Sequence, residues 1–270
     1  DSLDFAARKL TRHMHWRMVV CQGCGLIYSN PIIAPEVIEA LYQRADFVDE
    51  AQLHNMGRDY LAQVQRYRSR LLPNPRLLEV GCANGFFLEL VAQAGITEAW
   101  GVDPGRAAVN LASPAIRPRI INDFLREGMF REASFDLICS FQVFDHILYP
   151  NEFLTLIRHY LKPGGLFIQI HHNIHALHPS ILGRRASTYD VEHIHLWSRR
   201  TMRLILEKNQ LEPITLSNIA TAYKVDYVLR QLPLRGVLKA SSRAVANSLG
   251  LGGLTFRVPV ENMICVSRKV

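Results

Sequence analysis

From residue 76 to residue 208 the sequence alternates short apolar runs with stretches that have the 3.6-residue period of an amphipathic helix. The apolar runs cover residues 77–80, 99–102, 120–121, 135–140 and 166–170, and the helical stretches cover residues 86–94, 106–111, 152–161 and 201–208. Strands that alternate with helices at this spacing form a parallel sheet covered by helices on both faces. The sequence therefore predicts an α/β fold of the doubly wound type.

The regions on either side of this alternation differ from it. Pro35 opens a helical pattern, and a second amphipathic stretch runs from about residue 59 to residue 72, where Pro73 and Pro75 end it. We therefore expect a leader at 1–72 and a main domain at 73–270, with strands at 213–216 and 262–267. Between these strands we expect a helical cap at about 220–259, and its apolar side consists of Leu229, Leu232, Leu234, Val237 and Leu238. Because Pro233 and Gly236 interrupt that side, burial against the domain is favoured over a membrane-facing helix.

Composition narrows the class of protein. With 49% hydrophobic and 20% charged residues the chain is globular, and its apolar runs fall far short of the roughly 18 residues that span a bilayer. Residues 1–12 lack the apolar core of a secretory signal, and Asp1 suggests a processed start. The net charge of +7 permits an anionic partner, but the basic residues are dispersed, which favours solvated faces. Five cysteines, an odd number, fit a reducing cytoplasmic compartment.

Residues 77–88, Leu-Leu-Glu-Val-Gly-Cys-Ala-Asn-Gly-Phe-Phe-Leu, form an apolar strand that passes through a glycine turn directly into a helix. Gly81 and Gly85 allow the backbone to approach a ligand closely, and the helix start offers amide groups at that point. Asp103 follows 18 residues after Gly85, at the end of the next strand, where a carboxylate can accept both hydroxyls of a ribose. The spacing predicts a cofactor that contains a nucleoside.

Two common nucleotide cofactors do not fit this turn. A dinucleotide fingerprint needs glycines at 81, 83 and 86, but positions 83 and 86 hold Ala83 and Phe86. No Gly-Lys-Ser/Thr sequence exists for a P-loop. Glu79, just before the turn, suits a cationic amino group such as that of a methionine moiety.

The sequence resembles the class I S-adenosylmethionine-dependent methyltransferases over roughly residues 76–212. The resemblance rests on five segments in order: 78–85, 101–104 (Gly-Val-Asp-Pro), 122–123 (Asn-Asp), 135–140 with Asp145-His146, and 161–166 (Leu-Lys-Pro-Gly-Gly-Leu). It implies a Rossmann-like sheet of seven strands with a reversed last strand. It also implies a methyl-transferring enzyme with S-adenosylmethionine as its cofactor.

The same resemblance implies a set of cofactor-binding residues. The methionine end would lie over the loop from Glu79 to Gly85, the ribose on Asp103, the adenine edge on Asp123, and the end of the fourth strand beside the methionine. The residues concerned are Glu79, Gly81, Cys82, Ala83, Asn84, Gly85, Asp103, Pro104, Asn122, Asp123, Phe141 and Gln142. Ala83 departs from the family pattern, which has glycine there, and its methyl group narrows the turn. The alternative is that Gly81 and Gly85 serve only the packing of a cofactor-free sheet.

Histidines are the candidate catalytic groups, because methylation of a hydroxyl requires removal of a proton. Six of the eleven histidines follow the fifth strand, at the sheet edge where ligands bind: His171, His172, His175, His178, His193 and His195. We expect His146, which follows the fourth strand, to be the base, and His193, in a Glu-His segment that resembles a family lid, to be the second candidate. For each residue, a histidine bonded to loop backbone is the competing interpretation. His171 and His175 would share a face only in a helix, and without a His-Glu-x-x-His motif a polar substrate pocket is the better interpretation than a hydrolytic zinc centre.

Cys21 and Cys24 are separated by two residues and followed by Gly25, a spacing that lets two thiolates face one tetrahedral metal. Residues 18–31 resemble the second half of the zinc-binding leader found in some bacterial small-molecule methyltransferases. The first cysteine pair is absent, so zinc is expected only if the missing ligands lie upstream of Asp1. His13 and His15 are the alternative ligands, although solvated histidines are the more common outcome in a basic stretch.

Together these features favour an enzyme that methylates a small molecule such as a sugar, a lipid-linked intermediate or a secondary metabolite. The alternative is a non-catalytic methyltransferase-like domain that binds a ligand or partner. RNA methylation is a third interpretation, but the sequence has neither a basic stripe interleaved with aromatic residues nor an Asn-Pro-Pro-Tyr-type tetrad.

Overall fold

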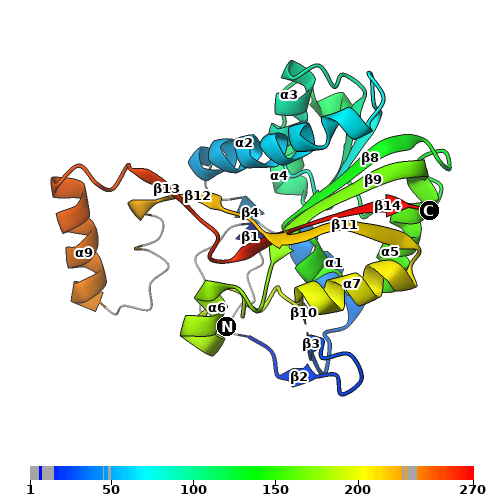
Figure 1. Ribbon diagram of the computed structural model, residues 1–270. Coiled ribbons are helices and arrows are strands. Elements are labelled where there is room, and N and C mark those ends of the chain that lie inside the picture. The colour runs from blue at the N-terminus through cyan, green and yellow to red at the C-terminus, as the bar shows by residue number, and fades with distance from the viewer. Residues whose placement is uncertain (1–5, 8–14, 45, 48–49, 227–228, 230–235) are drawn as a thin grey trace.

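The computed structural model of the chain describes residues 6–7, 15–44, 46–47, 50–226, 229 and 236–270. Its centre is a seven-stranded sheet in the order β11-β14-β9-β8-β5-β6-β7 (Figure 1). β14 is antiparallel to both of its neighbours, and the pairs from β9 to β7 are parallel. The strands are β5 (Leu77–Val80), β6 (Ala99–Val102), β7 (Ile120–Ile121), β8 (Phe135–Phe141), β9 (Leu161–His172), β11 (Leu211–Asn218) and β14 (Asn262–Lys269). The predicted α/β sheet with a reversed last strand is confirmed.

The strand β9 is longer than the predicted 166–170. It begins at Leu161, which pairs with Phe135 of β8, and continues through His171 and His172, which pair with Met263 and Asn262 of β14. His171 is therefore part of an extended strand. The helical face that His171 and His175 would have shared does not exist, which removes the predicted metal alternative based on these two residues.

Two layers of helices cover the sheet, and each encloses a separate apolar core (Figure 1). One layer contains α2 (Glu50–Arg66), α3 (Phe86–Gln93) and α4 (Arg106–Asn110), and the other contains α5 (Pro150–Tyr160) and α7 (Arg199–Lys208). Ser198 caps α7 by accepting a hydrogen bond from the Thr201 amide in a capping box. The predicted helix starts at residues 152 and 201 are each two residues late.

The helix α2 begins at Glu50, nine residues before the predicted start near residue 59, and a short 3-10 helix (Arg68–Arg70) follows it. Gly57 lies inside α2 where the helix closely approaches α3, and a Cβ at this position would lie 2.6 Å from Cδ1 of Leu90. Tyr60 and Val64 belong to the same core as α3 and the sheet. The expected division between residues 72 and 73 stays a prediction.

The N-terminal part contributes α1 (Pro35–Arg44), which starts at the predicted Pro35, and a small three-stranded sheet in the order β10-β3-β2. Its strands are β2 (Met18–Val20), β3 (Ile27–Ser29) and β10 (His195–Leu196). β1 (Ala6–Ala7) and β4 (Asp46–Phe47) pair in parallel. The β3–β10 pairing joins the start of the chain to the histidine-rich segment that follows β9.

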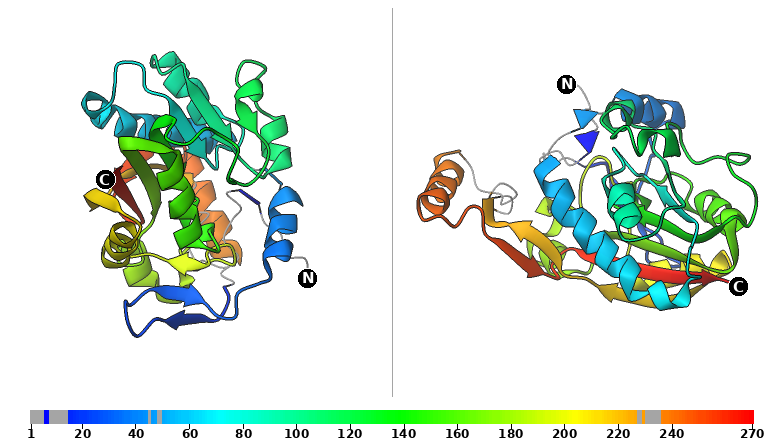
Figure 2. Two further views of the ribbon diagram at one scale, coloured as in Figure 1. Left: turned by 90° about the vertical axis from the view of Figure 1, so that its right-hand side faces the viewer. Right: turned by 90° about the horizontal axis from the view of Figure 1, so that it is seen from above.

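The insertion before β14 contains an antiparallel pair, β12 (Thr221–Lys224) and β13 (Thr255–Val258), and the helix α9 (Gly236–Ser248). The predicted helix is present, but it projects from the body instead of capping it (Figures 1 and 2). Asp59 of α2 anchors the base of this arm by accepting the Ala222 amide and pairing with Arg257. Leu232 and Leu234, part of the expected apolar side, lie outside the described residues.

Short helices complete the fold: two 3-10 turns (Arg117–Arg119 and Phe144–His146), α6 (Leu177–Leu182) and a third 3-10 turn (Gly183–Arg185). Within the described residues, none of the helices has the length and apolar character needed to cross a membrane. β6 and β7 lie on one side of β5, and β8 and β9 lie on the other, so the order of strands changes direction at β5. In an open α/β sheet, ligands bind at the carboxyl ends of the strands that flank such a reversal.

Candidate active site

The loop from Gly81 to Gly85 connects the end of β5 to the start of α3. Gly81, Ala83 and Gly85 all have positive φ angles, of 81°, 50° and 77°. A Cβ at Gly81 would lie 2.2 Å from Cγ2 of Val143, so glycine is required there for steric reasons as well. Ala83 adopts the left-handed conformation at a cost of about 1 kcal/mol for a residue with a Cβ. The loop therefore keeps the course of a glycine turn despite its alanine.

Asp103 follows β6 and holds two loops together. Oδ2 accepts a hydrogen bond from the amide of Ala83 at 2.7 Å, and Oδ1 accepts one from the amide of Gly105 at 2.7 Å. Burial raises the pKa of this carboxyl, and the two amides partly oppose that rise. Each carboxylate oxygen can accept a second hydrogen bond. Asp103 can therefore bind a pair of hydroxyls while it orders the loop.

A cavity of about 560 Å³ lies beside Asp103, at the carboxyl ends of β6 and β7. This volume is in the range of small-molecule sites. Asn122, one of its lining residues, donates from Nδ2 to the backbone oxygen of Asp103 at 2.8 Å. The lining residues are the predicted Pro104, Asn122 and Asp123 together with Gln43, Arg106, Asn110, Arg117 and Phe124. The cavity therefore lies next to the carboxylate that the sequence analysis expects to bind a ribose.

The remaining predicted cofactor residues lie around β5 and the end of β8. Glu79 is buried, and the Cys82 side chain packs in the core, so Cys82 can contribute only its backbone. Asn84 accepts the Phe86 amide at 3.3 Å. Phe141 stacks on Tyr60, with ring centroids 4.2 Å apart. Gln142 has a φ of 58° and donates from Nε2 to Oδ1 of Asn262, so the chain turns sharply where β8 ends.

His146 is the last residue of the 3-10 turn after β8. Its Nδ1 lies 2.7 Å from the hydroxyl of Tyr42 and 3.8 Å from Oε2 of Glu192. Burial, and then the charges of Glu192, Asp103 and Asp190, raise the pKa of Tyr42 well above its usual value, so Tyr42 remains a neutral phenol. Tyr42 and Glu192 were missed from the sequence. Glu192 is next to the predicted His193, but nothing in the sequence around Tyr42 marks it.

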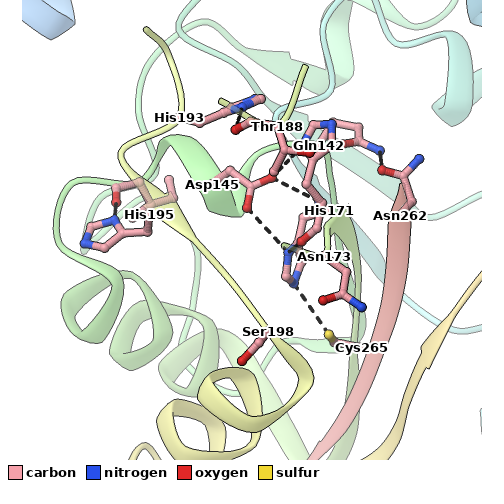
Figure 3. Close-up of polar contacts among 12 residues, drawn as sticks. Gln142, Asp145, His171, Asn173, Thr188, His193, His195, Ser198, Asn262 and Cys265 are labelled. Carbon is pink, nitrogen blue, oxygen red and sulfur yellow. Dashed lines mark hydrogen bonds and ion pairs between the residues drawn. The ribbon is translucent and has the colours of Figure 1, made fainter. Parts of the chain in front are cut away.

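His193 lies beside His146, with ring centroids 4.9 Å apart, so the structure brings the two predicted catalytic histidines together. Nδ1 of His193 faces the carbonyl oxygen of Thr188 at 2.9 Å (Figure 3). Burial, followed by the nearby charge of His172, lowers the pKa of His193. The His172 ring is on its other side, with centroids 4.6 Å apart. The rings of His146, His193 and His172 therefore lie in a row, with His193 in the middle.

Asp145 is fully buried between two of the β9 histidines. Its Oδ2 lies 2.9 Å from Nδ1 of His172 and accepts the His172 amide. Its Oδ1 lies 3.5 Å from Nδ1 of His171 (Figure 3). Burial alone would raise the pKa of Asp145, but hydrogen bonds from the two histidines hold it well below the usual range. Burial disfavours the charged form of His172, but Asp145 and Glu261 outweigh it and raise its pKa. In the sequence, Asp145 is marked only by its place in a segment that resembles the methyltransferase family.

Cys21 and Cys24 lie in the turn of the β2–β3 hairpin with free thiols, and Gly25 donates its amide to the Cys21 carbonyl at 2.9 Å. Backbone hydrogen bonds from Cys24 and Gly23 lower the pKa of Cys21. His15 contacts the Trp16 carbonyl through Nδ1, and His13 lies outside the described residues. In the part of the chain that the structure describes, no further histidine, cysteine or carboxylate joins the two thiols in a metal-binding group. Their role in zinc binding stays a prediction.

Comparison with known proteins gives a consistent picture. The profile of the family described as "Methyltransferase domain" matches residues 53–216. A ubiquinone biosynthesis O-methyltransferase from Agrobacterium fabrum is 26% identical over 58% of this chain and 60% of its own length, and one from Caulobacter sp. is 33% identical over 34% and 39%. A tRNA U34 carboxymethyltransferase from Idiomarina loihiensis is 30% identical over 36% of this chain and 32% of its own length. The chain thus spans about 60% or less of these three relatives.

Solved structures share the fold. An S-adenosylmethionine-dependent methyltransferase from Archaeoglobus fulgidus superposes with a TM-score of 0.54 and 16% identity over 79% of this chain and 94% of that one. The cyclase SpnF has a TM-score of 0.52 and 18% identity over 78% and 80%. At these identities the structures establish the architecture. By the profile match over residues 53–216, this chain belongs to the methyltransferase-domain family.

Proposed function

We propose that the enzyme transfers a methyl group to a hydroxyl oxygen of a small-molecule acceptor, with His146 as the general base. The observation that carries this proposal is the contact of His146 Nδ1 with Tyr42 and Glu192, immediately after β8 and next to the glycine turn. When bound, S-adenosylmethionine supplies an electrophilic methyl group on a sulfonium. The protein has to hold the cofactor, align the acceptor and remove its proton.

In this proposal, residues in the loops that follow β5, β6 and β7 bind the cofactor. Glu79 is suited to the cationic amino group, and the turn from Gly81 to Gly85 offers close approach to the methionine chain. Asp103 would accept the ribose hydroxyls, and the cavity lined by Asn122 and Asp123 is suited to the adenine. The order of these loops along the sheet edge supports this placement, because the methionine end would then point toward β8 and His146.

The proton chemistry follows from the surroundings of the His146 ring. A carboxylate at 3.8 Å from Nδ1 favours the tautomer that carries its proton on Nδ1, where the oxygen of Tyr42 accepts it. Nε2 then carries the lone pair that can accept the proton of an acceptor hydroxyl. Glu192 stabilises the imidazolium that forms. His193 packs edge-on against the ring and restricts its orientation.

An oxygen acceptor is supported by the relatives, because those from Agrobacterium and Caulobacter are named ubiquinone biosynthesis O-methyltransferases. It is also supported by the concentration of imidazoles and carboxylates at this edge, because a carbon or neutral nitrogen acceptor would not require them. Within this class the acceptor is a hydroxylated aromatic, a sugar, a lipid-linked intermediate or another secondary metabolite. A cytoplasmic location is part of the proposal and is supported by the free thiols of Cys82, Cys139 and Cys265.

The test is a methyl-transfer screen with S-adenosylmethionine labelled in its methyl group. The panel contains polyhydroxylated aromatics, nucleotide sugars, polyprenyl-linked hydroxylated precursors and transfer RNA, and products are located by mass spectrometry and NMR. We expect label on an oxygen of a small molecule. Label on nitrogen, carbon or RNA would contradict the proposal, and isothermal titration with the demethylated cofactor serves as the control for a folded binding site.

A further inference from the structure

We infer that Asp145, His172 and His193 form a binding site for a divalent transition metal, with Zn²⁺ as the best match. One ligand atom from each residue lies within 4.8 Å of those from the other two. The three residues come from different segments: the 3-10 turn after β8, the end of β9 and the loop before β10. The site is independent of Cys21 and Cys24.

The first half of the site is the Asp145–His172 pair. Oδ2 of Asp145 and Nδ1 of His172 are 2.9 Å apart, and the His172 amide also donates to Oδ2 at 3.1 Å, which fixes the carboxylate. On the opposite side of the ring, His172 Nε2 lies 3.5 Å from Oε1 of Glu261. A histidine with one ring nitrogen toward a metal and the other against a carboxylate is the usual arrangement around bound zinc. Glu261 thus supplies the outer support that a His172 ligand requires.

The second half of the site is His193. Its Nδ1 donates to the carbonyl of Thr188, which leaves the lone pair on Nε2 and fixes the ring (Figure 3). The amide of Ile194, the next residue, donates to the carbonyl of Asp145 at 2.9 Å, so the backbone holds the His193 segment against the 3-10 turn. His193 therefore has the outer hydrogen bond, and His172 the outer carboxylate contact, that ligating histidines normally make.

The donor set indicates the kind of metal. Two imidazole nitrogens and one carboxylate oxygen suit zinc and other first-row transition ions, whereas magnesium and calcium prefer oxygen donors throughout. Zinc bonds of about 2.0 to 2.2 Å place neighbouring donors about 3 to 4 Å apart. Side-chain movements of about 1 Å would therefore close the site from its present spacing. Three protein ligands leave at least one coordination position for another group.

That open position suggests a role, which rests on the proposed O-methylation. His193 contacts both His172 and His146, so the metal would lie next to the proposed base. An acceptor oxygen bound to the ion would have a lowered pKa. Its proton would pass to His146 as the carbon–oxygen bond forms and the methyl–sulfur bond breaks. The metal site itself does not depend on the acceptor being an alcohol.

The binding test uses Zn²⁺ in titration calorimetry and Co²⁺ in visible absorption, after the protein has been treated with a chelator. Every protein tested carries Cys21→Ser and Cys24→Ser, which removes the hairpin thiols from the result. We expect one ion per chain in this background. His193→Gln should weaken Zn²⁺ binding at least about 100-fold, and Glu261→Gln, which keeps all three ligands, about 10-fold. His175→Gln changes an exposed histidine of the same segment and should leave binding unchanged.

Absence of Zn²⁺ and Co²⁺ binding in the background protein would overturn the inference. It would also be overturned if His193→Gln and Glu261→Gln bound Zn²⁺ with the same affinity as the background protein. Circular dichroism establishes that each variant is folded, and Glu261→Gln remains informative if His193→Gln is not. A methyl-transfer assay on protein treated with a chelator tests separately whether the metal binds the acceptor. Loss of transfer that Zn²⁺ restores supports acceptor binding by the metal, whereas unchanged transfer to an oxygen overturns that role while the proposed O-methylation stands.

Discussion

The two halves of the sheet edge are built in different ways. The half that we propose for the cofactor consists of the loops after β5, β6 and β7, all within residues 79–123. Backbone contacts order these loops, because the Asp103 carboxylate accepts hydrogen bonds from two amides and holds the turn before it. The half that we propose for the acceptor combines side chains from distant segments. Tyr42 and Glu192 contact His146, and Glu261 contacts His172. The ring of His193 lies between the two histidines. A site that must bind one constant cofactor can be local. A site that selects an acceptor is assembled from distant segments.

The two halves also differ in their electrostatics. In the cofactor half, burial raises the pKa of Asp103. In the acceptor half, neighbouring groups move in opposite directions: the pKa of Asp145 falls, that of His172 rises and that of His195 falls to about 4. Groups with opposed shifts are typical of sites that move protons. The acceptor half should therefore be much more sensitive to pH than the cofactor half.

The largest effect is expected from His146→Gln, which damages the acceptor half alone. Without the base, turnover with the acceptor found in the screen should fall by roughly 10² to 10⁴, while the affinity for S-adenosylmethionine remains nearly unchanged. Steady-state kinetics and calorimetry measure the two quantities. His159→Gln, on the outer helix α5, is the matched control. If turnover survives in His146→Gln, His146 is not the base.

The next effect concerns the free energy of unfolding in acid. Burial lowers the pKa of His195 from 6.5 to about 4, so below pH 6.5 the unfolded chain takes up a proton that the folded protein refuses. The contribution of His195 to the free energy of unfolding is therefore complete above pH 6.5. It is lost as the pH falls toward 4, and the loss is roughly 3 kcal/mol. Urea titrations at pH 7.5 and 4.5 should show a smaller loss in His195→Gln. Equal losses in both proteins would contradict the assignment.

Asp103→Ala damages the opposite half. Loss of a charged acceptor for two hydroxyls should weaken binding of S-adenosylmethionine by about 1.5 to 3 kcal/mol. Calorimetry measures this change, and circular dichroism checks that the loop variant is folded. Asp145 and its histidines should be unaffected, so Zn²⁺ binding serves as the internal control. A folded variant with wild-type affinity would show that the ribose is bound elsewhere.

The smallest effect is expected from Tyr42→Phe, which removes the hydroxyl in contact with His146 but keeps the ring that packs edge-on against Phe124. Loss of one hydrogen bond to the base, worth about 1 kcal/mol, should lower turnover about fivefold. The pH–rate profile should also shift, because the surroundings of the imidazole change. Tyr149→Phe, at an exposed position, is the control. An unchanged rate and profile would remove Tyr42 from the site.

The sequence predicted the turn after β5 and the position of Asp103 after β6 because this information is local. A glycine turn after an apolar strand and an acid at the end of the next strand are adjacent in sequence and in space. The sequence did not predict Tyr42 or Glu261, because their roles depend on where α1 and the start of β14 lie in three dimensions. Periodicity also misplaced the start of α2, which begins at Glu50 and continues through Gly57, where the helix packs closely against α3.

The pairing of β3 with β10 has a consequence for how such enzymes diversify. Tyr28 pairs with His195 and the amide of Ser29 donates to the carbonyl of Ile194, so the N-terminal hairpin fixes the segment that carries His193. The hairpin lies outside residues 53–216, which match the shared family profile. Substitutions in the hairpin can therefore shift the segment that carries His193 without changing the turn from Gly81 to Gly85. We expect such variants to alter the use of the acceptor and to retain the affinity for S-adenosylmethionine.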